Sequence, residues 1–473
     1  MLLFAPAHLA RAQQSPPVSM VDDKAKLRRR VEEIAQSAMR ESPIVGMSIG
    51  VSFRGETIFA ESYGSADIER KVPATAETVY HFDSITKNIT AAAVMSLSQE
   101  GKLRLDDKVG DYVAAFRSSE VRVRELLNHS SGIKSYTSIP EFEKEQGADL
   151  GPEAIIKLMQ SAPPDFAPGA SWRYNNSGFY LLGLVIEKAS GMKYDEYLAT
   201  KFFRPLKMSA IVSSGVNPHV EKLAQGYKLK HGKPVGGEAI SWTPVFSGGA
   251  VCGTVGDLLT WETALESGRV VSMSSVGTMR KPTVLSDGTT IDYGFGTRLG
   301  TIEGRNCYGH TGSGGGFSNV LLSLPDDHLT VVILKNTEVA MASTTIAARI
   351  VRAILGLPEP VLKDLALSNE ELSHFAGTFD SDDGTIEAVA RGSQLWTRPE
   401  GSDGAGTRMR YQGDGVFSLD EESMVRFWPA QGKAQWGMGY EGGLFSAPRA
   451  GSAREGIRSR TQSSHLSLYV NHV

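Results

Sequence analysis

Ser84 and Lys87 are the first pair of residues in this sequence whose types and spacing could do chemistry. They precede a run rich in Ala, Val, Met and Leu that continues to residue 100 and predicts a helix. Residues three apart lie on one face of a helix, so the hydroxyl and the amine can meet. A serine hydroxyl is a weak nucleophile until a neighbouring base takes its proton. The pair therefore predicts a nucleophile beside its base.

The same spacing occurs at Ser131/Lys134 and at Ser190/Lys193, so spacing alone does not select one pair. Each of these other serines precedes a glycine that interrupts a helical pattern. Only Ser84 leads into a long apolar run. Context therefore favours Ser84 as the nucleophile.

Two more polar segments lie far downstream. Residues 168–178 stand directly before a predicted helix over residues 179–190, so their polar groups must lie at a surface or line a cleft. The glycines of residues 309–317 leave room for something to lie against the backbone. His129 ends a short predicted helix, and we interpret it as a hydrogen-bonded loop residue, with a catalytic base as the less favoured alternative.

The elements that must position these residues alternate between helices and hairpins. Residues 44–53 and 57–63 predict a hairpin, as do residues 320–324 and 329–334. Helical patterns cover the following further segments: residues 22–40, 257–265 and 340–355. This order predicts an α+β layer structure in which N-terminal and C-terminal pieces share one sheet.

Composition changes after residue 360, where short alternating segments punctuated by Gly and Asp predict the strands of a small barrel. These segments are residues 377–380, 386–389, 394–397, 416–419, 425–428 and 435–438. A chain of 473 residues is long enough for more than one domain. The predicted units are a signal peptide and leader (1–20), a large domain (21–360), a C-terminal β-domain (361–450) and a disordered tail (451–473).

Charge and composition exclude several classes of partner. The chain has 49 basic and 53 acidic residues, a net charge of −4, and so presents no basic field for nucleic acid. It contains no apolar run of about 18 residues, so we expect no membrane-spanning helix. Cys252 and Cys307 lie far apart and outside any Cys/His cluster, which argues against zinc. We interpret both cysteines as structural and expect no metal or cofactor.

Three separated motifs together resemble the active-site motifs of the serine β-lactamase and penicillin-binding-protein superfamily. They are Ser84-x-x-Lys87, Tyr174-x-Asn176 and His310-Thr311-Gly312. Their order and wide spacing are similar to the class C branch, which also holds family VIII esterases and D-aminopeptidases. Residues 126–132 and 166–169 resemble loops of that branch, so the likeness covers roughly residues 25–355. Residues 372–379 resemble the opening of a lipocalin-like C-terminal domain.

The resemblance implies a fold and a set of catalytic roles. The fold would be a β-lactamase/DD-peptidase-like α+β structure, an antiparallel sheet flanked by helices with a helical subdomain, followed by a small all-β, lipocalin-like barrel. Ser84 would be the acylated nucleophile, and Lys87 its general base or base partner. Tyr174 would pass the proton to the leaving group, and Asn176 would hold Lys87 or the substrate. The ordinary lysine pKa is about 10.4, so burial and a neighbouring cation or shared proton must lower the pKa of Lys87 by about 3.

The resemblance also assigns the third motif to the substrate. His310, Thr311, Gly312 and Ser313 would form an edge-strand wall, and the backbone N–H groups of Ser84 and Ser313 would form the oxyanion hole. Relatives that hydrolyse β-lactams usually carry Lys where this chain has His310. A histidine is only partly charged at neutral pH. We therefore expect weaker binding of a substrate carboxylate.

Asp83 is the second departure from the resemblance, because a small residue usually precedes the nucleophile. Its charge would oppose a developing oxyanion if it faced the site, and we expect it to point away. The leading hypothesis is a serine hydrolase of small esters, amides or D-peptides, with weak β-lactamase activity as a further option. The alternatives are a non-hydrolysing penicillin-recognition or peptidoglycan-sensing protein and, less favoured, a C-terminal ligand-binding module on a scaffold.

The N-terminus predicts export. Residues 1–9 are short and apolar, and Ala10-Arg11-Ala12 resembles a signal-peptidase site. We therefore expect a periplasmic or secreted protein whose mature chain starts near Gln13. N-terminal sequencing of protein recovered from periplasm or medium checks this, and an intact Met1 in cytosolic protein would contradict it.

Overall fold

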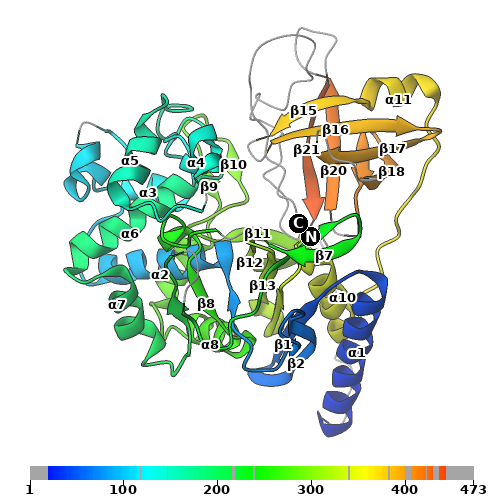
Figure 1. Ribbon diagram of the computed structural model, residues 1–473, viewed down its shortest axis with the longest axis horizontal. Coiled ribbons are helices and arrows are strands. Elements are labelled where there is room, and N and C mark those ends of the chain that lie inside the picture. Colours follow the sequence, from blue (N-terminus) through cyan, green and yellow to red (C-terminus); the bar gives the residue numbers. More distant parts are fainter. Residues whose placement is uncertain are drawn as a thin grey trace, which may run out of the picture.

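The computed structural model describes residues 20–443 apart from short gaps. The gaps are residues 118, 146, 216–218, 238–239, 339–340, 382–383, 400–405, 422 and 430–435. The predicted signal peptide and the predicted tail lie outside the described residues. Figure 1 shows a larger body of helices around a sheet, with a second, all-β sheet beside it.

A seven-stranded antiparallel sheet lies at the centre of the larger body, in the order β11-β12-β13-β14-β1-β2-β3. Its strands are β1 (Gly46–Phe53), β2 (Glu56–Asp67), β3 (Val72–Pro73), β11 (Arg298–Ile302), β12 (Arg305–Gly314), β13 (Phe317–Leu324) and β14 (Leu329–Lys335). β1 pairs with β14, Gly50 opposite Val332. The prediction that the two ends of this domain share one sheet is therefore confirmed.

Helices lie on both faces of this sheet and in a helical subdomain beside it. They are α1 (Met20–Glu41), α2 (Thr86–Gln99), α3 (Val123–Leu127), α4 (Pro140–Lys144), α5 (Pro152–Gln160), α6 (Asn176–Ser190), α7 (Tyr194–Leu198), α8 (Val255–Glu266), α9 (Met273–Met279) and α10 (Ser343–Leu355). The strand side chains alternate between two cores: Val331 and Ile333 pack with α1 and α10, while Val332 and Leu334 pack with α8 and the helical subdomain. The strand β14 is therefore buried on both sides along its whole length, as its run of Val, Ile and Leu indicates. No helix within the described residues is long and apolar enough to cross a membrane.

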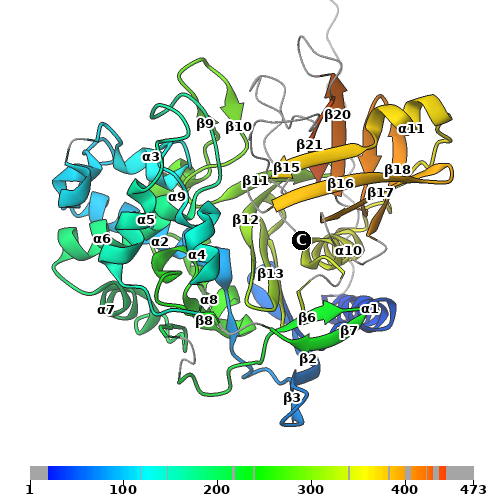
Figure 2. The ribbon, with the colours of Figure 1, turned by 45° about the horizontal axis from the view of Figure 1, so that its top comes forward.

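The helical subdomain is built around α2, which Figure 2 shows among the surrounding helices. Every residue of α2 from Thr86 to Leu97 is buried. Its few polar side chains are paired: Trp261 Nε1 donates to Asn88 Oδ1 at 2.9 Å, and Thr90 Oγ1 donates to the Ser247 carbonyl at 2.7 Å. A helix buried all round is held in place from every side, so it gives the residues at its start a fixed position.

Short strands and hairpins complete this body. They are β4 (Tyr80–His81), β5 (Ile211–Val212), β6 (Tyr227–Lys230), β7 (Lys233–Gly236), β8 (Val251–Gly253), β9 (Thr283–Val284) and β10 (Thr290–Ile291). β8 lies between β4 and β5 in a three-stranded sheet. That pairing fixes the chain directly before Ser84.

The C-terminal sheet follows α11 (Asn369–Phe375) and has seven antiparallel strands in sequence order. They are β15 (Gly377–Ser381), β16 (Gly384–Arg391), β17 (Gln394–Pro399), β18 (Thr407–Gly413), β19 (Val416–Ser418), β20 (Ser423–Pro429) and β21 (Trp436–Gly443). The sequence predicted all of these except β18, whose apolar residues alternate with arginines. Phe375, Phe417 and Phe427 pack against one another with ring centres 5.0–5.3 Å apart. Aromatic side chains thus fill the core of this sheet.

An arginine joins the two parts. Arg349 of α10 donates from Nε and Nη2 to the two carboxyl oxygens of Glu421, at 2.8 Å each, and from Nη1 to Glu41 at 2.9 Å. Glu421 lies between β19 and β20, and Glu41 ends α1. This bidentate pair fixes geometry as well as charge.

Removal of the Phe417 side chain tests whether the C-terminal sheet has its own core. Phe417 is fully buried, and Phe417→Ala should destabilise this sheet by about 3 to 5 kcal/mol. We expect limited proteolysis to cut the variant within residues 361–443 and to spare residues 31–355. Met273→Ala, at a side chain that is 51% exposed, is the control. Simultaneous loss of both parts would contradict the prediction.

Candidate active site

Ser84 lies in a short 3-10 turn, Asp83–Ile85, between β4 and the start of α2. The regular helix therefore begins two residues later than the sequence predicted. The turn still keeps the pair together, because Lys87 follows in the first turn of α2. Lys87 Nζ lies 2.9 Å from Ser84 Oγ.

Lys87 is fully buried, and its second partner is the backbone carbonyl of Gly248 at 2.8 Å. Burial lowers the pKa of Lys87 well below its ordinary value, and the nearby Arg298 cation lowers it further, while Asp83 opposes the shift. A neutral amine has a lone pair that can accept the Ser84 proton. Burial and a neighbouring cation, the two causes that can lower the pKa of a lysine base, are therefore both present at Lys87.

Tyr174 lies against the same amine, with its ring centre 4.9 Å from Lys87 Nζ. Its loop is fixed by His129, whose Nδ1 accepts the Asn175 N–H at 3.1 Å. The Asn175 side chain in turn caps α6 by accepting the Gly178 N–H at 2.8 Å. These bonds hold Tyr174 and Asn176 at the entrance to α6.

His129 is fully buried among aromatic rings, including Tyr174 at 4.4 Å and Tyr293 at 4.6 Å between centres. Burial holds its pKa well below the ordinary value, with the Lys87, His310 and Arg298 charges acting in the same direction. A neutral side chain that accepts a backbone N–H fits the structural interpretation of His129, and not that of a catalytic base.

Asn176 lines the pocket that Ser84 faces. Its Nδ2 donates to Thr137 Oγ1 at 3.2 Å. The hydrogen-bond partners of the Lys87 amine are instead Ser84 and Gly248. Of the two roles that the resemblance implies for Asn176, the geometry fits contact with the substrate and not support of Lys87.

His310 differs from the sequence-based expectation. The side chain is fully buried, its Nδ1 donates to the Thr311 carbonyl at 2.6 Å, and its Nε2 accepts from the Tyr293 hydroxyl at 3.0 Å. Burial places its pKa well below the ordinary value, and the Arg298 and Lys87 charges lower it further. Because both ring nitrogens are engaged and the ring is neutral, the expected partial charge for a substrate carboxylate is not available in this geometry.

The rest of the third motif lies on β12, which the resemblance placed at the sheet edge. β11 lies outside β12 in the sheet, so the strand as a whole is not an edge strand. The β11–β12 pairing nevertheless stops at Gly309, and the residues beyond it run past the end of β11. A Cβ on Gly312 would lie 2.2 Å from the Phe82 carbonyl oxygen, so only glycine allows this close approach.

Ser313 stands one residue beyond this contact and lines the pocket together with Ser84. The carbonyl of Thr311, two residues before Ser313, accepts the hydrogen bond from His310 Nδ1. An oxyanion hole formed by the backbone N–H groups of Ser84 and Ser313 stays a prediction.

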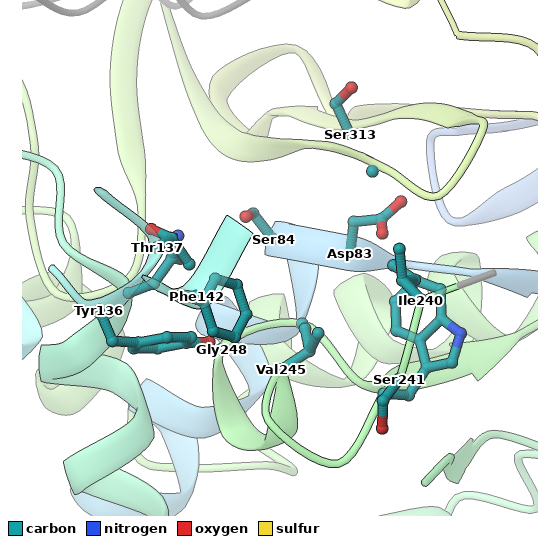
Figure 3. Close-up of a pocket in the computed structure, with 14 residues that line it drawn as sticks. Asp83, Ser84, Tyr136, Thr137, Phe142, Ile240, Ser241, Val245, Gly248 and Ser313 are labelled. Carbon is teal, nitrogen blue, oxygen red and sulfur yellow. The ribbon is translucent and has the colours of Figure 1, made fainter. Parts of the chain in front are cut away.

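The pocket encloses about 620 Å³ of empty space, including open solvent at its mouth. Figure 3 shows Tyr136 and Phe142 on one side of Ser84 and Ile240 on the other. Its lining residues are Asp83, Ser84, Tyr136, Thr137, Phe142, Asn176, Ile240, Ser241, Trp242, Val245, Gly248, Gly249, Ser313 and Gly314. A concave lining of apolar side chains with a few polar groups suits a small molecule.

Asp83 faces this pocket, contrary to the expectation that it points away. Its backbone has a φ of +49°, which is a left-handed conformation. The side chain therefore does not follow the alternation between two faces that residues of an extended strand show. Its Oδ2 accepts from Asn319 Nδ2 at 3.1 Å. Asp83 is the one acidic or basic residue among those that line the described pocket.

Arg298 is the main participant that the sequence analysis missed. It is 5% exposed, and its guanidinium carbon lies 5.6 Å from the centre of the Tyr174 ring. Arg298 is the first residue of β11 and pairs with Gly309, the residue directly before the third motif. The turn at Glu303 and Gly304, both with positive φ, joins β11 to β12, and its Glu-Gly sequence could have indicated this hairpin.

Replacement of Arg298 tests how its charge acts on Lys87. Activity that needs neutral Lys87 is lost as pH falls through the lysine pKa. Arg298→Met removes a cation that lowers this pKa, so the acid limb of kcat/KM should move to higher pH by about 1, with about tenfold lower kcat/KM below that limb. Arg298→Lys keeps a cation and should stay closer to the wild-type midpoint. A midpoint that does not move in Arg298→Met would contradict the assignment.

Comparisons with known proteins identify similar chains. The chain is 28% identical over 361 residues to "Penicillin-binding protein 4*" of Bacillus subtilis (strain 168), a match that covers 71% of this chain and 79% of the relative. It is 25% identical over 333 residues to a D-aminopeptidase of Gluconobacter oxydans (strain 621H), covering 70% of this chain and 62% of that protein, less than two thirds of its length.

A solved structure shows the same fold. The octameric penicillin-binding protein homologue from Pyrococcus abyssi superposes with a TM-score of 0.64 at 25% identity, covering 88% of this chain and 96% of that one. The sequence model of the Beta-lactamase family matches residues 31–355, more than half of the 473 residues. The matched segment contains Ser84, Lys87, Tyr174 and the whole of β12. The chain therefore belongs to the Beta-lactamase family.

Proposed function

We propose that this protein is a serine hydrolase that forms a covalent acyl-enzyme on Ser84 and hydrolyses small esters or amides, of the esterase or D-amino-acid peptidase type. The observation that carries the proposal is the 2.9 Å separation of Ser84 Oγ and the buried Lys87 amine at the wall of a pocket. A hydroxyl and a base at this distance form an activated nucleophile.

The reaction follows from these positions. Lys87 Nζ takes the Ser84 proton as Oγ attacks the substrate carbonyl carbon, and the carbonyl oxygen becomes an oxyanion. Collapse of this intermediate breaks the bond to the leaving group, which receives a proton through Tyr174, whose ring lies 4.9 Å from Lys87 Nζ. Water then attacks the acyl-enzyme with the same base, and Ser84 regains its proton. Two backbone donors aimed at the oxyanion would contribute about 3 kcal/mol each.

The pocket favours esters and amides over β-lactams. A penicillin or cephalosporin carries a carboxylate, but no Lys, Arg or His lines the described pocket. Apolar side chains such as Phe142, Ile240 and Val245 suit an acyl or leaving group that carries no negative charge instead. The D-aminopeptidase relative supports an amide-cleaving activity. Weak β-lactamase activity is a side reaction within this proposal.

A second candidate is a non-hydrolysing protein that becomes acylated by penicillin. The similarity to a penicillin-binding protein over 79% of that relative favours it. Both candidates need Ser84 and Lys87, and they differ only in deacylation. Turnover of p-nitrophenyl butyrate beyond one equivalent per protein supports the hydrolase, whereas a stoichiometric burst without turnover supports the second candidate.

Removal of the nucleophile tests the proposal directly. Ser84→Ala should abolish hydrolysis of p-nitrophenyl butyrate and leave the melting temperature close to that of the wild type, because the hydroxyl has a chemical and not a packing role. A fluorophosphonate should add once to the wild-type peptide that carries Ser84, and Ser131→Ala should still be labelled. An adduct on Ser131 or Ser190 would overturn the assignment.

A further inference from the structure

We propose that the Asp83 carboxylate binds a positively charged amino group next to the reacting carbonyl, so that the preferred substrates are amides or esters of amino acids with a free amine. The inference deepens the proposed hydrolase function and rests on it. Asp83 directly precedes the nucleophile, and it supplies the one acidic or basic side chain among the residues that line the described pocket.

The first support is position. Asp83 and Ser84 are neighbours in the chain and line the same pocket, so a substrate whose carbonyl carbon is at Ser84 occupies the cavity that Asp83 also lines. In Figure 3 the Asp83 carboxyl lies between Ser84 and Ile240, on the side of the pocket away from Tyr136. The α-amine of an amino acid is attached to the atom next to the carbonyl carbon. It would therefore lie beside this carboxyl in an acylating substrate.

The second support is the state of the two carboxyl oxygens. Oδ2 accepts from Asn319 Nδ2 at 3.1 Å, and Asn319 also donates to the His81 carbonyl at 2.8 Å, which fixes the side chain. Oδ1 has no hydrogen-bond partner among the described residues. A Cβ on Gly314, another pocket residue, would lie only 3.3 Å from Oδ1, so the glycine leaves this oxygen uncovered.

The third support is the charge around Asp83. The side chain is 4% exposed, and burial and the Glu338 carboxylate raise its pKa well above the ordinary value, while Lys87 opposes this. An ammonium group would supply the missing counter-charge. Lys87 does not repel it, because the pKa of Lys87 is lowered. His81, in the strand before Asp83, has a pKa lowered to about 3 by burial and is also neutral.

The test compares two substrates that differ only in the amine. Alanine p-nitroanilide, as the D and L isomers, carries it, and propionyl p-nitroanilide lacks it. We expect the wild type to prefer the better alanine isomer at least tenfold in kcat/KM. Asp83→Asn keeps the size and the bond to Asn319 but removes the charge, so it should lower this preference about ten- to a hundredfold.

Asp149→Asn is the matched control. The Asp149 carboxylate accepts a hydrogen bond from the pocket residue Ser241 at 2.8 Å but does not line the pocket. Its variant therefore removes one negative charge close to the pocket but not inside it. The control should keep the wild-type preference for the amine. A purely structural role of Asp83 would lower both rates alike and leave the ratio unchanged, which would overturn the proposal.

The pH dependence of the wild type is a second measurement that needs no variant to fold. The ratio of the alanine to the propionyl rate should rise with pH as Asp83 ionises, and fall above about 8 as the substrate amine loses its proton. A flat ratio from pH 5 to 9 would contradict the proposal. If p-nitrophenyl butyrate is turned over but the amine gives no advantage, only this inference fails. If no ester or anilide is hydrolysed and Ser84 takes no adduct, the proposed function itself fails.

Discussion

The burial of the Lys87 amine is the constraint on which the rest of the site depends. A lysine in water would hold its proton and could not act as a base near neutral pH. Here the side chain begins a helix that is buried along most of its length, and the Arg298 cation lies in the same region. Desolvation of a charge is costly, so the surrounding fold must be stable enough to hold the amine there.

Desolvation also lowers the pKa values of the histidines around the Lys87 amine. His129 and His310 are both fully buried, and neither has a pKa near its ordinary value. His129 holds the loop at Asn175 through Nδ1, whereas His310 bonds to the Thr311 carbonyl and the Tyr293 hydroxyl through its two ring nitrogens. Neither offers a charge to the substrate. Arg298 is the cation that acts electrostatically on all three of these groups.

The sequence predicted the order of the elements and the pairing of Ser84 with Lys87, because these depend on local patterns. Ser84 precedes a long helix that is mostly buried, and the strands β13 and β14 are buried along their whole length. The direction of Asp83 was not predictable, since it follows from a backbone φ of +49°. The contribution of Arg298 could not be predicted either. Arg298 is far from Lys87 in the sequence, and only the pairing of β11 with β12 brings it near the site.

Gly312 has a mechanical consequence for the catalytic centre. With the Phe82 carbonyl oxygen only 2.2 Å from where a Cβ would stand, the large sheet and the chain leading to Ser84 are in direct backbone contact at Gly312. A backbone contact cannot relax through a change of side-chain rotamer. The position of the chain before Ser84 relative to the large sheet is therefore fixed at this point. Adaptation to new substrates would then fall to the side chains that line the pocket, such as Phe142 and Ile240.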